Sequence, residues 1–195
     1  MNQPSEPQKT IFFGFGSPHG FDQIGWHIID AIDRLLPSST TRIPTELYKL
    51  NTPIDLLNHA LASNPDQPTS RTTLWILIDA CININTCDNV AEFEPNPFNQ
   101  RPRIHRWDWP PKNASPYTLE NPIPNGSSHG VGLIETLQLA ETLGLTPDSV
   151  WIFAIECNLP IPPTANAPTD LAVDAKSDSY CAAQILSQLP HITLK

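Results

Sequence analysis

The amino-acid sequence predicts an α/β sandwich built on a largely parallel sheet. Segments with the apolar content of buried strands alternate with segments of helical periodicity, in the order β-α-β-α-β-insertion-α-β-α. The strongest strand signal is the uninterrupted apolar run LWILI over 74–78, which is typical of a strand buried on both faces of a parallel sheet. With 195 residues, the chain is expected to form a single α/β domain over 1–195 that buries a sizeable core.

The first half of the chain is predicted to contain three strands and two helices. Apolar residues recur at helical spacing after Asp22, and Pro37 stops this first helix. Thr52 and Pro53 have the residue types of an N-cap and a first helical position, so they start the second helix. In order, these elements are a strand over 10–13, a helix over 23–36, a strand over 43–50, a helix from Thr52 through Leu61 and a strand over 74–78 that ends at Asp79.

The second half begins with a polar, Pro-rich insertion over 82–126, in which Arg103–Trp109 is a candidate strand. An insertion of this length is typical of a functional or a disordered loop. The predicted helix over 132–144 has an apolar face and is followed at its end by Gly144, a residue type favoured just past a helix. A buried strand over 150–155 and a terminal helix over 169–189 complete the predicted fold.

The composition argues against several classes of function. The net charge of −9 disfavours a surface that binds nucleic acid or an anionic membrane. No run of about 18 apolar residues is present, and the polar segment 1–10 lacks the features of a secretion signal, so we expect a cytoplasmic protein. The four cysteines form no Cys-x-x-Cys pair and are expected to be reduced, mostly buried thiols.

Glycine and proline are unevenly distributed along the chain. There are 22 prolines but only 8 glycines, and all the glycines except Gly144 fall within 14–25 and 126–132. Glycine is required where the backbone takes a positive φ or approaches another group closely, so these two segments are predicted to be special loops. The prolines gather in the 82–126 insertion and within 160–168, where they indicate rigid surface loops.

Three polar residues are predicted to lie at the edge of the sheet formed by the carboxyl ends of the strands, where open α/β sheets bind ligands. Asp22 follows the first strand, Asp79 ends the third, and His129 precedes the helix over 132–144 in a glycine-flanked loop. Two carboxylates and an imidazole suit a divalent first-row metal. Each residue also has a simpler interpretation: Asp22 as a helix N-cap, Asp79 as a turn residue and His129 as an ordinary loop histidine.

Other catalytic and cofactor motifs are absent from the sequence. The first glycine loop does not match G-x-G-x-x-G, and neither a P-loop nor a G-x-S-x-G elbow is present, so no organic cofactor is expected. In the insertion, His105, Trp107 and Trp109 fit either an aromatic contact surface or a loop packed on itself.

Three segments resemble, in order, the motifs of the nickel–iron hydrogenase maturation proteases. Residues 14–26, GFGSPHGFDQIGW, are similar to the family's N-terminal pattern, roughly G-x-G-[NS]-P-x-x-x-D-[DE]-x-x-G. Ile78-Asp79-Ala80 resembles its strand-ending V-D-A. Residues 128–133, SHGVGL, resemble its S-H-x-x-G/S-L motif at the start of a helix, and the resemblance covers the core over 10–156.

The resemblance implies a three-layer sandwich, with a twisted, mostly parallel sheet and helices on both of its faces. It implies an endopeptidase that removes the C-terminal extension of a hydrogenase large-subunit precursor after nickel insertion. The family's nickel-recognition site carries over to Asp22, Asp79 and His129, which are therefore the predicted catalytic and metal-binding residues. The nickel is carried by the substrate, the partner is the precursor, and we expect the enzyme to be a monomer.

The sequence departs from the family pattern at several positions. Phe21 occupies the place of the first of two adjacent acids, and Lys49-Leu50-Asn51 stands where an Asp often ends the second strand. The usual C-terminal L-S-P motif is not evident. The same site therefore also fits a non-catalytic assembly protein that senses the metallated precursor. A small-molecule α/β enzyme unrelated to hydrogenases is the third hypothesis.

Overall fold

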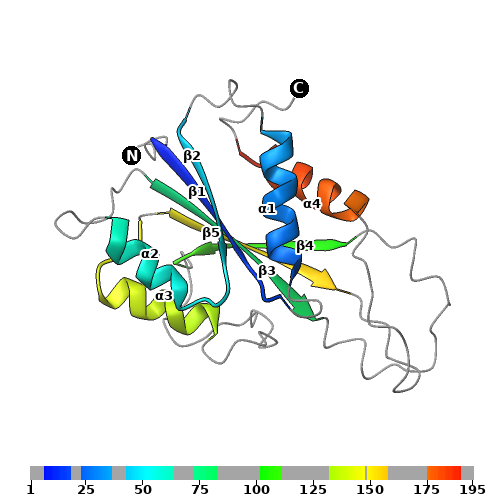
Figure 1. Cartoon of the computed structure of the whole chain (residues 1–195). Helices are drawn as coiled ribbons and strands as arrows, with labels where there is room; N and C mark the ends of the chain where they lie inside the picture. Colours follow the sequence, from blue (N-terminus) through cyan, green and yellow to red (C-terminus); the bar gives the residue numbers. More distant parts are fainter. Residues whose placement is uncertain are drawn as a thin grey trace, which may run out of the picture.

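The computed structural model describes residues 7–18, 23–36, 43–63, 73–82, 102–110, 132–147, 149–157 and 175–189. In this part of the chain the elements are, in order, β1 (Lys9–Phe15), α1 (Ile24–Leu35), β2 (Thr45–Leu50), α2 (Asp55–Ser63), β3 (Thr73–Ile82), β4 (Arg103–Trp109), α3 (Leu133–Thr142), β5 (Ser149–Cys157) and α4 (Ala175–Ser187). Figure 1 shows helices on both sides of a twisted sheet.

The five described strands form one sheet in the order β2-β1-β3-β5-β4. β1 is parallel to β2 and β3, and β3 is parallel to β5. β4 is antiparallel to β5 and forms one edge of the sheet. The predicted α/β architecture with a mostly parallel sheet is confirmed.

Two apolar cores cover the two faces of the sheet. α1 and α4 pack on one face, against buried side chains that include Phe12, Ile78 and Phe153. α2 and α3 pack on the opposite face, against buried side chains that include Phe13 and Leu77. Successive residues of a strand point to opposite faces, so one continuous apolar run supplies both cores. The predicted three-layer sandwich is therefore confirmed as well.

β3 is longer than its sequence pattern predicts. The strand continues beyond Asp79 to Ile82, and its last residues pair with β5 from Ile155 to Cys157. The added residues, Ala80-Cys81-Ile82, are apolar, and β5 extends equally far beside them, so nothing interrupts the ladder at Asp79. The prediction that Asp79 terminates the strand is wrong, and the carboxylate instead projects from within the strand.

β4 confirms the candidate strand inside the Pro-rich insertion and rules out a self-packed loop for its aromatic residues. His105, Trp107 and Trp109 belong to a strand of the main sheet rather than to a loop packed on itself. Trp109 is buried in the core beneath α2 and α3, which leaves His105 and Trp107 more accessible. Because β4 is antiparallel to β5, it begins at the edge where β5 ends.

The end of α3 follows its sequence signal, whereas the start of α2 does not coincide with the predicted one. Gly144 has a φ of 67° and ends α3 with the paired carbonyl hydrogen bonds of a Schellman motif. The Thr52 N–H and hydroxyl both donate to the Asp55 carboxylate, at 3.0 and 3.2 Å. The turn after Thr52 is closed by i→i+3 bonds, so regular helix begins at Asp55, later than predicted.

No helix among the described residues is long and apolar enough to cross a membrane.

Candidate functional site at the carboxyl edge of the sheet

The order in which the chain adds strands to the sheet changes direction between β1 and β3, and the carboxyl ends of these two strands mark this topological switch point. From β1 it passes through α1 to β2 on one side, and from β2 it crosses through α2 to β3 on the other side of β1. Because α1 and α2 cover opposite faces, the ends of β1 and β3 lie at the position where such sheets bind ligands. Figure 1 shows the arrowheads of β3 and β5 at this same edge.

Asp79 of β3 lies at this edge. The last pair that joins β1 to β3 is Gly14 with Ile78, so Asp79 is level with the end of β1. Its Oδ1 atom accepts a hydrogen bond of 2.8 Å from the Ala80 N–H, and the residue is half-buried. Strand alternation puts Asp79 on the same face as Leu77, the face that α2 and α3 cover.

Glycine allows α1 to begin directly against this edge. A Cβ atom on Gly25 would lie 2.7 Å from the Phe15 nitrogen and 2.8 Å from the Ile78 carbonyl oxygen, too close for any side chain. A Cβ atom on Gly14 would collide with the Gly25 backbone in turn. The predicted need for close approach is therefore correct at these two positions, and what approaches the strand is helix α1.

Hydrogen bonds fasten the segment between β1 and α1 to the end of β2. The Leu50 carbonyl oxygen accepts from the Gly16 N–H at 3.0 Å and from the Trp26 indole N–H at 2.9 Å. The Gln23 side-chain amide donates to the Pro18 carbonyl oxygen at 3.0 Å. These contacts hold both ends of the segment that contains Asp22 beside the sheet edge.

Asp22 and His129 lie outside the described residues, so their grouping with Asp79 stays a prediction. The helices that follow these two residues, α1 and α3, both begin at the carboxyl edge of the sheet, as this grouping requires. α1 starts at the carboxyl ends of β1 and β3, and α3 leads directly into the amino end of β5, so α3 itself begins on the carboxyl side. Within the described part of the chain, no three His, Cys, Asp or Glu side chains are grouped as metal ligands.

The structure adds a pair of residues to this edge, Glu156 and His105, and sequence reasoning did not predict that they would meet. Glu156, near the end of β5, is buried, and its Oε2 lies 3.0 Å from Nε2 of His105 on β4. His105 and Asp79 each pair with Ala154 of β5 from opposite sides. The available signal for Glu156 was an acid near the end of an apolar run, the same signal that identified Asp79.

Cys81 lies between the carboxylates of this edge but is not a reactive thiol. It pairs with Glu156 across β3 and β5 and is buried. Burial, together with the charges of Glu156 and Asp79, raises the pKa of the Cys81 thiol to about 11. The thiol is therefore protonated at neutral pH, as expected for a free buried cysteine.

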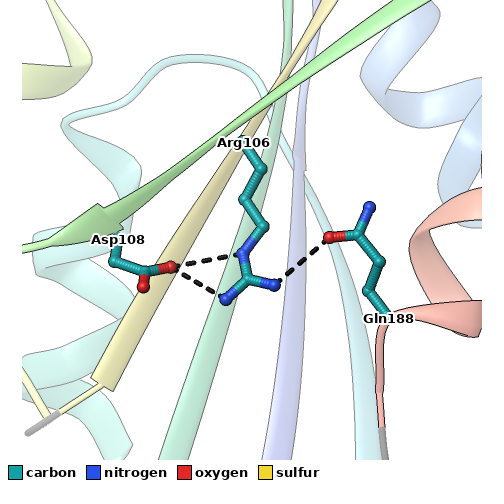
Figure 2. Close-up of polar contacts among 3 residues, drawn as sticks. All are labelled: Arg106, Asp108 and Gln188. Atoms are coloured by element: carbon teal, nitrogen blue, oxygen red, sulfur yellow. Dashed lines mark hydrogen bonds and ion pairs between the residues drawn. The ribbon is translucent and has the colours of Figure 1, made fainter.

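β4 is anchored on its other face by Arg106. Figure 2 shows the Arg106 guanidinium between Asp108 of the same strand and Gln188, which follows α4. Nη2 of Arg106 lies 2.9 Å from Asp108 Oδ1, and Nη1 lies 3.2 Å from Gln188 Oε1. The guanidinium carbon also lies 3.7 Å from the centre of the Trp151 ring on β5. These contacts tie the edge strand to its neighbouring strand and to the end of a helix.

Solved structures of two proteases are similar to this chain. An endopeptidase from Escherichia coli, solved in solution, matches with a TM-score of 0.54 and 16% identity, over 93% of this chain and 91% of that chain. The [NiFe] hydrogenase maturation protease HybD from Thermococcus kodakarensis matches with a TM-score of 0.54 and 14% identity, over 93% and 98% respectively. No protein-family model matches the chain, and no curated protein is significantly similar in sequence. The motif resemblance is thus confirmed at the level of the fold.

Proposed function

We propose that this protein is an endopeptidase that removes the C-terminal extension of a nickel–iron hydrogenase large-subunit precursor after nickel insertion. The observation that carries the proposal is the position of Asp79, level with the end of β1 at the reversal point of the sheet. It is supported by a fold shared with an endopeptidase and a hydrogenase maturation protease. A monomeric enzyme acting in the cytoplasm is part of the proposal.

Asp22, Asp79 and His129 are the residues proposed to bind the nickel of the precursor. Oxygen and nitrogen ligands suit a divalent first-row ion, and the ion arrives with the substrate, so it would align the scissile bond with this edge. A bound divalent ion polarises a carbonyl group or activates a water molecule. The role of the three side chains is to bind and orient the metallated substrate, so that only a nickel-loaded precursor is cut.

The test is cleavage of purified precursor, with and without nickel, followed by mass spectrometry. We expect wild type to release the C-terminal extension from the nickel-loaded precursor alone. Asp79→Asn, Asp22→Asn and His129→Ala should each slow this cleavage at least about 100-fold, because each removes a ligand for the substrate's metal. Asp30→Asn is the matched control, since Asp30 is a surface acid of α1 that pairs with Lys49. Undiminished cleavage by the three site variants would contradict the site.

A non-catalytic sensor of the metallated precursor is the second candidate. Lys49 lies near the position where the family often has an Asp. Its Nζ is 2.6 Å from Asp30 Oδ1, so Lys49 forms an ion pair with α1. Phe21 likewise replaces an acid. A wild-type protein that binds the nickel-loaded precursor but leaves its mass unchanged would favour this candidate over the endopeptidase.

A further inference from the structure

Glu156 and His105 form an acid–imidazole pair that the proposed nickel ligands do not use. The Glu156 side chain is 7% exposed and the His105 side chain 43% exposed, with 3.0 Å between Oε2 and Nε2. A carboxylate can only accept a hydrogen bond, so in the neutral form of the ring Nε2 carries the proton and Nδ1 has a lone pair. This is the arrangement by which an acid orients a neutral histidine as a proton acceptor.

His105 lies in the same cross-strand row as Asp79. His105 pairs with Ala154 across β4 and β5, and Asp79 pairs with Ala154 across β3 and β5. Side chains paired in this way point to the same face, so Asp79 and His105 flank a single methyl group. Two strand spacings separate their Cα atoms by about 10 Å, so the two side chains lie on the same face with one residue between them.

The His105 ring is held from more than one side. Trp107 stacks on it, with 5.8 Å between ring centres and 25° between ring planes. The opposite face of the same strand is tied down by Arg106, which contacts Trp151 and Gln188. A histidine fixed on an anchored strand is better placed for proton transfer than one on a free loop.

We propose that His105 is the proton-transfer residue of the peptide hydrolysis and that Glu156 positions its ring, an inference that rests on the proposed endopeptidase function. Nδ1 of His105 takes a proton from the water molecule whose oxygen attacks the scissile carbonyl carbon. His105 then gives that proton to the leaving nitrogen as the C–N bond breaks. One water is consumed, a new carboxyl and a new amino terminus form, and His105 returns to its neutral state.

The first experiment compares His105→Gln with wild type in steady-state cleavage of nickel-loaded precursor. Gln keeps a hydrogen-bonding side chain but cannot carry the proton, so kcat should fall about 100-fold or more while KM changes less than about threefold. The matched control is His27→Gln, because His27 is also a partly exposed imidazole beside a buried acid, Asp178, at 3.7 Å on the opposite face of the sheet. Equal kcat values for His105→Gln and His27→Gln would overturn the proposal.

The second experiment tests Glu156 with a spectroscopic readout beside activity. In nitrogen-15 NMR spectra of the free protein, His105 should carry its proton on Nε2. In Glu156→Gln, whose amide can donate, the proton should move to Nδ1, and kcat should fall. Glu156→Asp keeps the acceptor and should restore the Nε2 proton and part of kcat. A His105 proton that stays on Nε2 in Glu156→Gln would contradict the positioning role.

Failure of this inference is distinguishable from failure of the proposed function. If wild type does not cut the nickel-loaded precursor, both fail. If wild type cuts, Asp79→Asn does not, and His105→Gln cuts at the wild-type rate, the proposed function stands and only the role of His105 is rejected. A thermal unfolding midpoint for His105→Gln within about 2 °C of wild type shows that any loss of kcat is chemical.

Discussion

β3 and β4 flank β5 and each carries one residue of the proposed machinery, but different forces hold the two strands. β3 is an apolar central strand, paired on both sides, whose side chains enter both cores, so burial and strand pairing fix the position of Asp79. β4 is an antiparallel edge strand with four exposed residues, and it is held by Trp109 at its end and by Arg106 on its outer face. The comparison shows that the proposed site combines a residue on a strand held by apolar burial with a residue on a strand held by a few side-chain contacts.

The largest expected difference between the strands appears when the same side chain is truncated in each. Ile78→Ala in β3 should lower the free energy of unfolding by about 3–4 kcal/mol, because Ile78 is fully buried between the sheet and α1. Ile104→Ala in β4 should lower it by about 1 kcal/mol, since Ile104 is only partly buried against the same core. Urea denaturation with a constant m value measures both. Equal losses would refute the contrast between the strands.

The next effect concerns the attachment of α1 to the end of β3. Gly25→Ala should lower the free energy of unfolding by about 2–3 kcal/mol, because its Cβ would press on backbone atoms of Phe15 and Ile78 that cannot give way. Gly144→Ala is the control: it has open space and loses only about 1 kcal/mol from its positive φ. Thermal unfolding ranks the two, and a larger loss at Gly144 would argue against close packing of α1 on the sheet.

A smaller effect is expected when the anchor of β4 is removed. Arg106→Ala should cost about 0.5–1 kcal/mol, since the guanidinium stacks on Trp151 at a partly exposed site. The change should be local: amide hydrogens of β4 should exchange faster while those of β3 keep their protection. Hydrogen exchange read by mass spectrometry gives the answer. Uniform acceleration across both strands would mean that β4 is part of the central folding unit.

The smallest expected effect is at Cys181 of α4, the helix whose end contacts Arg106. Burial, together with the nearby Asp178 charge, raises the pKa of the Cys181 thiol to about 12. Its thiolate at pH 8 should be about a thousandfold rarer than that of an ordinary thiol, so alkylation should be very slow. Stability from the protonated thiol is present below about pH 9 and is lost as the pH rises toward 12. Alkylation of Cys181 should stay equally slow in Arg106→Ala, and a faster rate would show that α4 moves with β4.

The same contrast explains how much of the molecule was predictable. The run LWILI indicated a central strand because burial on both faces of a sheet favours an apolar residue at every position. Its continuation past Asp79 depended on pairing with β5, and local pattern does not reveal a partner so distant in the chain. The segment RIHRWDW predicted a strand, but neither its direction nor its place beside β5 can be derived from a short alternating pattern.

For the site, sequence reasoning identified Asp79 and its edge of the sheet, while the assembly of Asp22 and His129 around it stays a prediction. Glu156 carried the same signal as Asp79, an acid near the end of an apolar run. Its pairing with His105 depends on an antiparallel register between β4 and β5 that only the folded chain displays.

The double hydrogen bond on the Leu50 carbonyl has a consequence for the thermodynamics of substrate binding. Together with the glycine contact of α1, it orders residues at both ends of the segment between β1 and α1 as part of folding. Residues that are already ordered lose little conformational entropy when a ligand arrives. Under the proposed function, more of the interaction with the metallated substrate is then left for affinity and for distinguishing it from a metal-free one.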